Sequence, residues 1–283
     1  MKKLFWWFIV LVKLLACYFR GLESFLKFIG FYSPGKMNEI AYAVCITKSH
    51  IDCIRPYVTP ITGKIILEFG PGDSILSALV AHAYGFKESI LVDIKPLKEK
   101  LIKDNLNNYD NLLRLIDIDV KKAKPIESLK YKYLDLGLKS LHEIPDASID
   151  IIWSHVVLQH VHRNEVNAIL TEFSRILKPD GIMSHKIDLK DCICGSLNNL
   201  RFSPKIWDTK TVYRSGFYTN RLRADDWLRL LEKFNFISIE VDKTFFPKMP
   251  IKYSKLSQHF KMNYTMEQLM VSGLHVISRR TKN

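Results

Sequence analysis

The sequence predicts an α/β protein built on a doubly wound, mostly parallel β-sheet, and three observations support this prediction. Residues 64–93 read as strand, glycine turn, helix and strand. Short apolar runs of strand length recur at 131–134, 149–153 and 182–189, separated by helical or turn-forming stretches. These runs are largely apolar, as strands covered on both faces are. A chain of 283 residues with 47% hydrophobic content has room for one such domain with appendages.

The other elements follow from helical spacing and from turn signals. Apolar residues three and four positions apart mark the helices, and a proline marks the start of the helix after the second strand. The expected helices lie at 37–48, 51–57, 96–108, 165–177 and 224–234. A tight Pro179-Asp180-Gly181 turn is expected to lead into the strand at 182–189. Two closing strands are expected at 237–241 and 274–278.

A glycine turn after the first strand predicts a ligand site, because ligands of open α/β sheets bind at the carboxyl ends of the strands. A dinucleotide loop would have a third glycine where this chain has Ile75, and Asp73 would repel a diphosphate. S-adenosylmethionine (SAM) has no phosphate, and its ammonium and sulfonium groups are compatible with Glu68 and Asp73. The bare backbone of Gly70 and Gly72 permits close approach. An ordinary glycine turn with capping acids is the competing interpretation.

Three further strand ends complete the candidate cofactor site. Asp93 ends the second strand, about 20 residues after the loop, where an acid accepts hydrogen bonds from ribose hydroxyls in nucleotide-binding units. Asp135 follows the third strand, where it would meet the adenine edge or serve as a turn carboxylate. Ser154 ends the fourth strand on the same rim.

Three segments resemble class I SAM-dependent methyltransferases of the type 11 kind. LEFGPGDS at 67–74 resembles their glycine loop in its Glu-x-Gly-x-Gly form, with Ser74 in place of the third glycine. PDASIDIIWSHVVLQHV at 145–161 resembles their fourth-strand segment, and LKPDGI at 177–182 resembles the turn into the fifth strand. The resemblance implies a Rossmann-like, seven-stranded sheet with an antiparallel last strand, and SAM as the cofactor.

A hydroxyl acceptor requires a general base, and the predicted strand ends offer three candidates. We rank His185 and Asp188 first and His155 next. In an alternating strand His185 shares a face with Ile187, while Asp188 lies on the other face. Packed, hydrogen-bonded histidines are the alternative, and we favour that role for His160.

The acceptor is predicted from a resemblance to other methyltransferases and from the absence of a motif for nucleobase methylation. The HKIDLKD run at 185–191 and the aromatic and basic loop after it resemble methyltransferases of bacterial surface-polysaccharide or lipid-linked glycan synthesis. We therefore expect O-methylation of a glycan or lipid-linked acceptor. The net charge of +13 suits a polyanion, but WSHV at 153–156 lacks the Asp/Asn-Pro-Pro-Tyr/Phe run of nucleobase amine methylation, so nucleic acid is disfavoured. A nucleic-acid methyltransferase, a non-catalytic SAM-binding membrane adaptor and an NAD-dependent oxidoreductase remain alternatives.

Cysteine usage gives no support for a metal site or a disulfide framework. The five cysteines are odd in number and irregularly spaced. Cys192-x-Cys194 lacks a second Cys or His pair at zinc spacing, so we predict no metal.

Residues 1–32 form a hydrophobic and amphipathic segment that predicts a helix on a membrane surface. Lys13, Arg20 and Lys27 recur every seven residues and form one basic stripe. The uninterrupted apolar run at 4–12 is too short to span a bilayer, which needs about 20 residues. We expect a cytoplasmic protein held at the inner face of a membrane. An export signal, a tilted span and packing on the protein itself or on a partner subunit are the alternatives.

The remaining chain divides into a helical cover at 33–60 and a methyltransferase domain at 61–283. Three loop-rich stretches are expected as insertions in that domain, at 109–130, 192–220 and 243–270.

Overall fold

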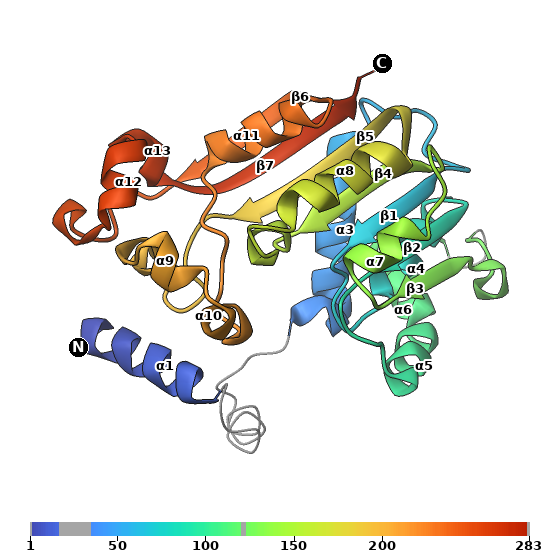
Figure 1. Ribbon diagram of the computed structural model, residues 1–283. Coiled ribbons are helices and arrows are strands. Elements are labelled where there is room, and N and C mark those ends of the chain that lie inside the picture. The colour runs from blue at the N-terminus through green and yellow to red at the C-terminus, as the bar shows by residue number, and fades with distance from the viewer. Residues whose placement is uncertain (1, 17–34, 120–122, 282–283) are drawn as a thin grey trace.

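The computed structural model describes residues 2–16, 35–119 and 123–281, and it contains a seven-stranded sheet in the order β3-β2-β1-β4-β5-β7-β6 (Figure 1). The strands are β1 (Ile65–Phe69), β2 (Glu88–Val92), β3 (Tyr131–Leu134), β4 (Ile149–His155), β5 (Leu177–Asp188), β6 (Phe236–Phe245) and β7 (Val271–Arg280). Strands β1 to β5 pair in parallel, and β7 pairs antiparallel with both β5 and β6. The predicted Rossmann-like sheet with an antiparallel last strand is confirmed.

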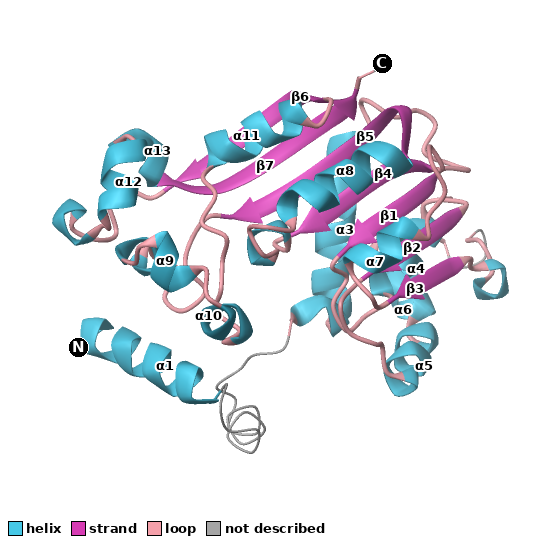
Figure 2. Cartoon of the chain, in the orientation of Figure 1, coloured by secondary structure: helices cyan, strands magenta, loops and turns pink. Residues whose placement is uncertain are grey.

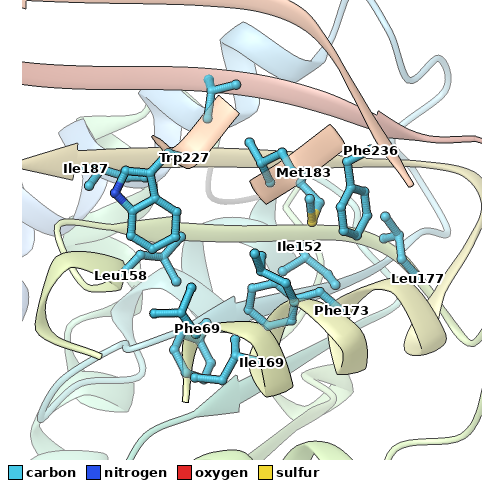
Figure 3. Close-up of a cluster of buried hydrophobic side chains, with 14 of the residues drawn as sticks. Phe69, Ile152, Leu158, Ile169, Phe173, Leu177, Met183, Ile187, Trp227 and Phe236 are labelled. Carbon is cyan, nitrogen blue, oxygen red and sulfur yellow. The ribbon is translucent and has the colours of Figure 1, made fainter. Parts of the chain in front are cut away.

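Helices cover both faces of this sheet (Figure 2). The helices of the described residues are α1 (Lys2–Ala16), α3 (Ile40–Ile54), α4 (Leu76–Ala83), α5 (Glu99–Asn107), α6 (Tyr109–Leu115), α7 (Leu138–His142), α8 (Val166–Ile176), α9 (Pro204–Trp207), α10 (Lys210–Arg214), α11 (Ala224–Lys233), α12 (Gln258–Asn263) and α13 (Met266–Met270). One apolar core joins the sheet to α3, α4 and α6, and another joins it to α7, α8 and α11. Figure 3 shows the second core, where Phe173 of α8 lies against Phe69, Ile152 and Met183 of the strands.

Strand alternation decides which side chains enter each core. In β5, Met183 and Ile187 belong to the core under α8, whereas Ile182 belongs to the core under α3 and α4. The same alternation runs through the shorter strands, because successive side chains of a strand point to opposite faces. Side chains near the carboxyl ends of β1, β2, β4 and β5 therefore point alternately to the two faces of the sheet.

Two predicted boundaries differ from the structure. The helices expected at 37–48 and 51–57 are one continuous helix, α3, because Val44, Ile51 and Ile54 extend a single buried face and no glycine or proline interrupts it. The strand β5 already begins at Leu177. The predicted turn at Pro179–Gly181 lies within it as an irregularity, where the pairing with β4 shifts register and Asp180 takes a φ of 63°.

The loop-rich stretches contain short helices. Residues 109–130 include α6, residues 192–220 include α9 and α10, and residues 243–270 include α12 and α13. Strand β6 extends to Phe245, where its last pairing is with Val271, so the sheet continues into the third stretch.

The first helix, α1, packs on the stretch after β5. Trp6 and Val10 form an apolar cluster with Trp207, Phe217 and Tyr218. Of the basic stripe predicted for residues 1–32, Arg20 and Lys27 lie outside the described residues. Within the parts of the chain that the structure describes, no helix combines the length and apolar character needed to cross a bilayer.

Candidate active site

The loop after β1 has the backbone that its glycines predict. Gly70 and Gly72 take φ values of 85° and 67°, in the left-handed region that glycine tolerates best. A Cβ atom on Gly70 would lie 2.6 Å from Cγ1 of Val157, so here the loop packs tightly against the segment after β4. A Cβ on Gly72 would meet nothing within 4 Å. The first glycine thus serves packing, and the second presents open backbone to a ligand.

The end of β2 joins the same site through Asp93. Its Oδ2 accepts the Gly72 N–H at 3.0 Å, and its Oδ1 accepts the Ile94 N–H at 2.7 Å. The carboxylate is therefore held rigidly beside the glycine loop. Each of its oxygens retains a lone pair, because a carboxylate offers about four acceptor positions. The structure thus brings together Gly72 and Asp93, which lie 21 positions apart in the chain.

The start of α4 does not form an open anion cradle. The Ile75 N–H donates to Oδ1 of Asn105 at 2.9 Å, and the Leu76 N–H donates to Oγ of Ser74 at 3.1 Å. These amides would face a pyrophosphate in a dinucleotide site. Asn105 was not identified from the sequence, because it lies on α5 and nothing local marks it as a partner of this loop.

Glu68 lies beneath the loop. Its side chain points toward α4, where its carboxyl accepts a hydrogen bond from Ser77, and the residue is 2% exposed. Burial raises the pKa of Glu68 to about 8, because a carboxylate loses its hydration there. The carboxyl is therefore mostly protonated at neutral pH. Asp73, the other acid of the loop, is exposed.

Two exposed apolar side chains flank the acids at the ends of β2 and β3. Ile94 follows Asp93 and is 71% exposed, and Leu136 follows Asp135 and is 58% exposed. Gly137 lies against Ile94, since a Cβ there would be 2.9 Å from its Cγ2. Sequence reasoning named the acids and missed these neighbours. The signal was present as an apolar residue directly after each strand-end acid.

Ser154 and His185 lie inside the protein, between the sheet and α8. Ser154 Oγ and His185 Nδ1 are 2.8 Å apart, and the two residues are 0% and 1% exposed. The His185 ring stacks on Phe173 at 5.7 Å between centroids. Burial lowers the pKa of His185 to about 3. His185 shares the α8 side with Ile187, as alternation predicts, and this position keeps its ring away from the rim.

His155 faces the opposite side of the sheet and begins a chain of polar groups. Its Nδ1 is 3.2 Å from Nε2 of His50 on α3, and Nδ1 of His50 is 2.7 Å from Oγ of Ser184. The same Oγ is 3.0 Å from Nε2 of His275 on β7. Burial, with the Lys186 ammonium adding to it, lowers the pKa of His155 to about 4. His155 is therefore a neutral imidazole at neutral pH, and only the fold reveals its connection to His50 and His275.

The residue after His155 has a strained backbone. Val156 takes a φ of 58°, which is rare for a β-branched residue, and its N–H donates to the Lys186 carbonyl at 2.7 Å. Such strain persists only where the surroundings fix it, and it concentrates at functional sites. Here it turns the chain from His155 toward Val157, which packs on Gly70.

Asp188 marks a second group of polar side chains at the end of β5. Its Oδ1 accepts the Lys190 N–H at 2.9 Å, and Lys190 Nζ lies 3.5 Å from Oδ2. Nearby, Cys192 Sγ lies 3.9 Å from Nδ1 of His160, which also contacts the Tyr218 carbonyl at 3.0 Å. Burial lowers the pKa of His160 and raises that of Cys192 to about 12. The thiol is therefore protonated and is a poor nucleophile.

A comparison with known proteins finds one family that matches part of the chain. Residues 67–184 match the sequence model of a family described as a methyltransferase domain, which is less than half of the chain. No curated protein matches the chain. Within the described residues, no group of three or more histidine, cysteine or acidic side chains is arranged to hold a metal ion.

Solved methyltransferases have a distantly similar fold. A SAM-dependent methyltransferase from Mesorhizobium loti is 16% identical, with coverage of 81% of this chain and 96% of that one and a TM-score of 0.47. One from Methanosarcina mazei is 15% identical, with coverage of 82% and 98% and a TM-score of 0.48. Phosphoethanolamine N-methyltransferase 2 from Haemonchus contortus, with SAM bound, is 13% identical, with coverage of 83% and 53% and a TM-score of 0.49.

The family match coincides with the elements that build the rim. It begins at Leu67 in β1, ends at Ser184 in β5, and contains the glycine loop, Asp93 and the end of β4. The cofactor of this kind of domain is SAM, as the sequence predicts. The part of the chain that matches a methyltransferase domain is thus the part that forms the glycine loop and the strand ends around it.

Proposed function

We propose that the protein transfers the methyl group of SAM to a hydroxyl of a glycan or lipid-linked acceptor at a membrane surface. The observation that carries this proposal is His155, a neutral imidazole at the end of β4, two residues before the side chain that packs on the glycine loop. Transfer to a hydroxyl needs a base beside the sulfonium, and a neutral imidazole at this strand end suits that role.

The rim around the glycine loop fits the cofactor. The lone pairs left on Asp93 suit the two ribose hydroxyls, and the open backbone at Gly72 suits the amino-acid portion. Ile94 and Leu136 offer exposed apolar surface for the flat adenine. When bound, SAM supplies an activated methyl group, so the protein has to align the acceptor and exclude water.

The histidine chain supports a base at Nε2 of His155. In one consistent arrangement of protons, His155 Nδ1–H donates to His50, His50 Nδ1–H donates to Ser184, and the Ser184 hydroxyl donates to His275. This arrangement leaves the lone pair of His155 on Nε2, where it accepts the proton of the acceptor hydroxyl. His50 fixes the tautomer and the ring orientation, as a positioning residue does.

The outward face of α1 supports the membrane location. Trp7, Phe8, Leu11 and Leu15 are 48%, 59%, 55% and 45% exposed, and their spacing places them on one side of the helix. Aromatic and aliphatic side chains on one helix face, in a chain with a net charge of +13, suit an anionic lipid surface.

The first experiment tests the cofactor and the base separately. Isothermal titration should show saturable SAM binding to the full chain and to His155→Asn with similar affinity. With an acceptor in hand, His155→Asn should lower kcat by about 10²-fold to 10⁴-fold, the range typical of a lost general base. Wild-type activity should be nearly constant above about pH 5 as far as this group is concerned and fall as the pH drops through about 4, because His155 is then protonated.

The control variant is His142→Asn, which removes an imidazole that is 57% exposed and paired with Glu172. It should leave kcat and SAM affinity unchanged. The acceptor is sought by mass spectrometry of lipids and surface glycans from cells with and without the gene, as a mass difference of one methyl group. A folded protein without saturable SAM binding would refute the proposal, and an unimpaired His155→Asn would refute the base.

A further inference from the structure

A cavity of about 980 Å³ lies between α1, the loop after β5 and the segment that leads to α12 and α13. These elements gather at the end of the sheet where β5 finishes, on the left in Figure 1. The residues that line the cavity are Trp6, Trp7, Cys194, Ser196, Asn198, Arg201, Met249, Pro250, Ile251, Lys252, Tyr253, Lys255 and Met266. None of them belongs to the cofactor loop or to the histidine chain.

The lining combines apolar walls with a cationic edge. Arg201, Lys252 and Lys255 contribute positive charge, no carboxylate occurs among the described lining residues, and none of the three makes an ion pair with another described side chain. Two buried donors here also lack a partner, Nε of Arg201 and Nε1 of Trp6, which is 2% exposed. Unpaired buried donors are costly, and a bound acceptor group would satisfy them.

A short loop leads from the end of β5 to the wall of the cavity. Asp191, directly after β5, accepts hydrogen bonds from the N–H groups of Ile193, Cys194 and Asn198, at 3.1, 2.7 and 2.9 Å, and so holds this loop in one conformation. Within the loop, Cys192 lies beside His160, whereas Cys194 lines the cavity. One short loop thus reaches from the strand-end polar groups to the cavity wall.

Helix α1 spans the same two places and has a second, outward face. Its Trp6 lines the cavity, and its Lys13 lies near Cys192, close enough to interact electrostatically. Trp7 both lines the cavity and is 48% exposed, beside the exposed Leu11. The outward apolar face of α1 therefore borders the cavity at Trp7.

We propose that this cavity binds the acceptor through an apolar chain joined to a phosphate, with the chain against Trp6, Ile251 and Met266 and the phosphate at Arg201, Lys252 and Lys255. This inference rests on the proposed function, and it narrows the acceptor to a lipid phosphate or a lipid-linked glycosyl phosphate. Guanidinium and ammonium groups recognise phosphate, and the neighbouring apolar surface gives affinity for the chain.

The test uses the full-length protein with dodecyl phosphate below its micelle concentration as the probe. Dodecanol and inorganic phosphate are the two control ligands, and the fluorescence of the cavity tryptophans reports binding. Dodecyl phosphate should bind at least about tenfold more tightly than either control, because only it uses both features of the cavity. Equal binding of dodecanol would show a nonspecific apolar site and would overturn the assignment of the cationic edge.

Variants locate the binding. Arg201→Gln with Lys252→Gln should weaken dodecyl phosphate binding by at least about tenfold, as the loss of two charge-assisted contacts implies. The matched control, Lys100→Gln with Lys103→Gln on α5, removes the same charge at the other end of the sheet and should have no effect. Met266→Trp fills the cavity and should block binding, whereas Met262→Trp, on a side chain that is 74% exposed and does not line the cavity, should not.

SAM titration of the same samples separates this inference from the proposed function. All four variants should bind SAM like the wild type, because none of the changed residues belongs to the cofactor rim. If SAM binds and dodecyl phosphate does not, the cavity assignment is wrong and the methyltransferase proposal stands. If dodecyl phosphate binds and SAM does not, the cavity holds a lipid phosphate in a protein that does not transfer methyl groups.

Discussion

At the scale of single residues, the candidate active site depends on where the fold places charge. Asp93 stays at the rim and is held by two backbone amides, so it remains available to a ligand. Glu68 lies only one strand away, but its carboxyl is buried under α4 and its pKa is raised to about 8. The Glu68 carboxyl is therefore mostly protonated at neutral pH, because it loses its hydration under α4.

The Glu68 carboxyl gives the first stability prediction. Its folded pKa of about 8 exceeds its ordinary value of 4.5, so the stabilisation is complete below pH 4.5 and is lost as the pH rises through about 8. Wild-type protein should lose stability between pH 6 and pH 9, with Glu68 contributing on the order of 1 kcal/mol or more of that loss. Glu68→Gln should lose less, because the amide stays neutral and still accepts the Ser77 hydrogen bond.

Urea unfolding at the two pH values measures this difference. Glu143→Gln is the matched control, because it makes the same change at an exposed acid. An identical loss of stability in wild type and Glu68→Gln would show that Glu68 is already ionised in the folded state.

At the scale of elements, helix α1 has one face that is covered by the protein and one face that is exposed. The inner face of α1 packs on Trp207, Phe217 and Tyr218, so part of this apolar helix is covered by the protein itself. Its outer face stays exposed. Of the alternatives for residues 1–32, packing on the protein and lying on a membrane are therefore compatible, since they use different faces of the same helix.

The outer face of α1 gives a vesicle-binding prediction. Leu11→Ser with Leu15→Ser should weaken binding to anionic vesicles by at least about tenfold, because two large apolar side chains no longer enter the lipid surface. Flotation with phosphatidylglycerol-containing and with purely zwitterionic vesicles measures it, and the wild type should prefer the anionic ones.

The matched control is Leu115→Ser with Ile237→Ser, which removes side chains that are 54% and 59% exposed elsewhere on the molecule. This pair should bind vesicles like the wild type. Equal weakening by both pairs, or no binding by the wild type, would remove α1 as the membrane contact.

At the scale of the whole molecule, the sheet carries neutral histidines on both faces near its carboxyl edge. His185 lies under α8, and His50, His155 and His275 lie on the α3 side. Burial lowers the pKa of each of them. The fold therefore excludes protons from four imidazoles that an unfolded chain would protonate near pH 6.5.

The free energy of unfolding should consequently fall already at mildly acidic pH. Because the folded pKa values are depressed, the stabilisation is present above pH 6.5 and is lost as the pH falls toward 4. Each such histidine adds up to about 1.4 kcal/mol per pH unit to the slope. Urea unfolding at pH 7, 6 and 5 should show this decline, and His185→Gln should reduce its slope whatever its effect on absolute stability. His142→Asn makes a matched change at an exposed imidazole.

Much of the fold follows from local patterns. The glycine turn, the apolar strands and the helical stripes were sufficient to predict the sheet class, because each buried strand or helix shows the apolar pattern typical of its own type. The bounds of α3 were less predictable, because its continuous buried face is defined by packing against the sheet. The start of β5 was also less predictable, because the turn at Pro179–Gly181 lies within the strand, where its pairing with β4 shifts register.

The sequence by itself predicted the rim, because the glycine turn and Asp93 each directly follow an apolar strand that local patterns reveal. Only the tertiary structure decided which polar groups serve that rim. It buried His185 and Glu68, linked His155 to His50 and His275, and set α1 beside a cationic cavity. The reason is that burial and pairing are properties of residues far apart in the chain, and the strand's alternation assigns a side chain to a face without saying what covers it.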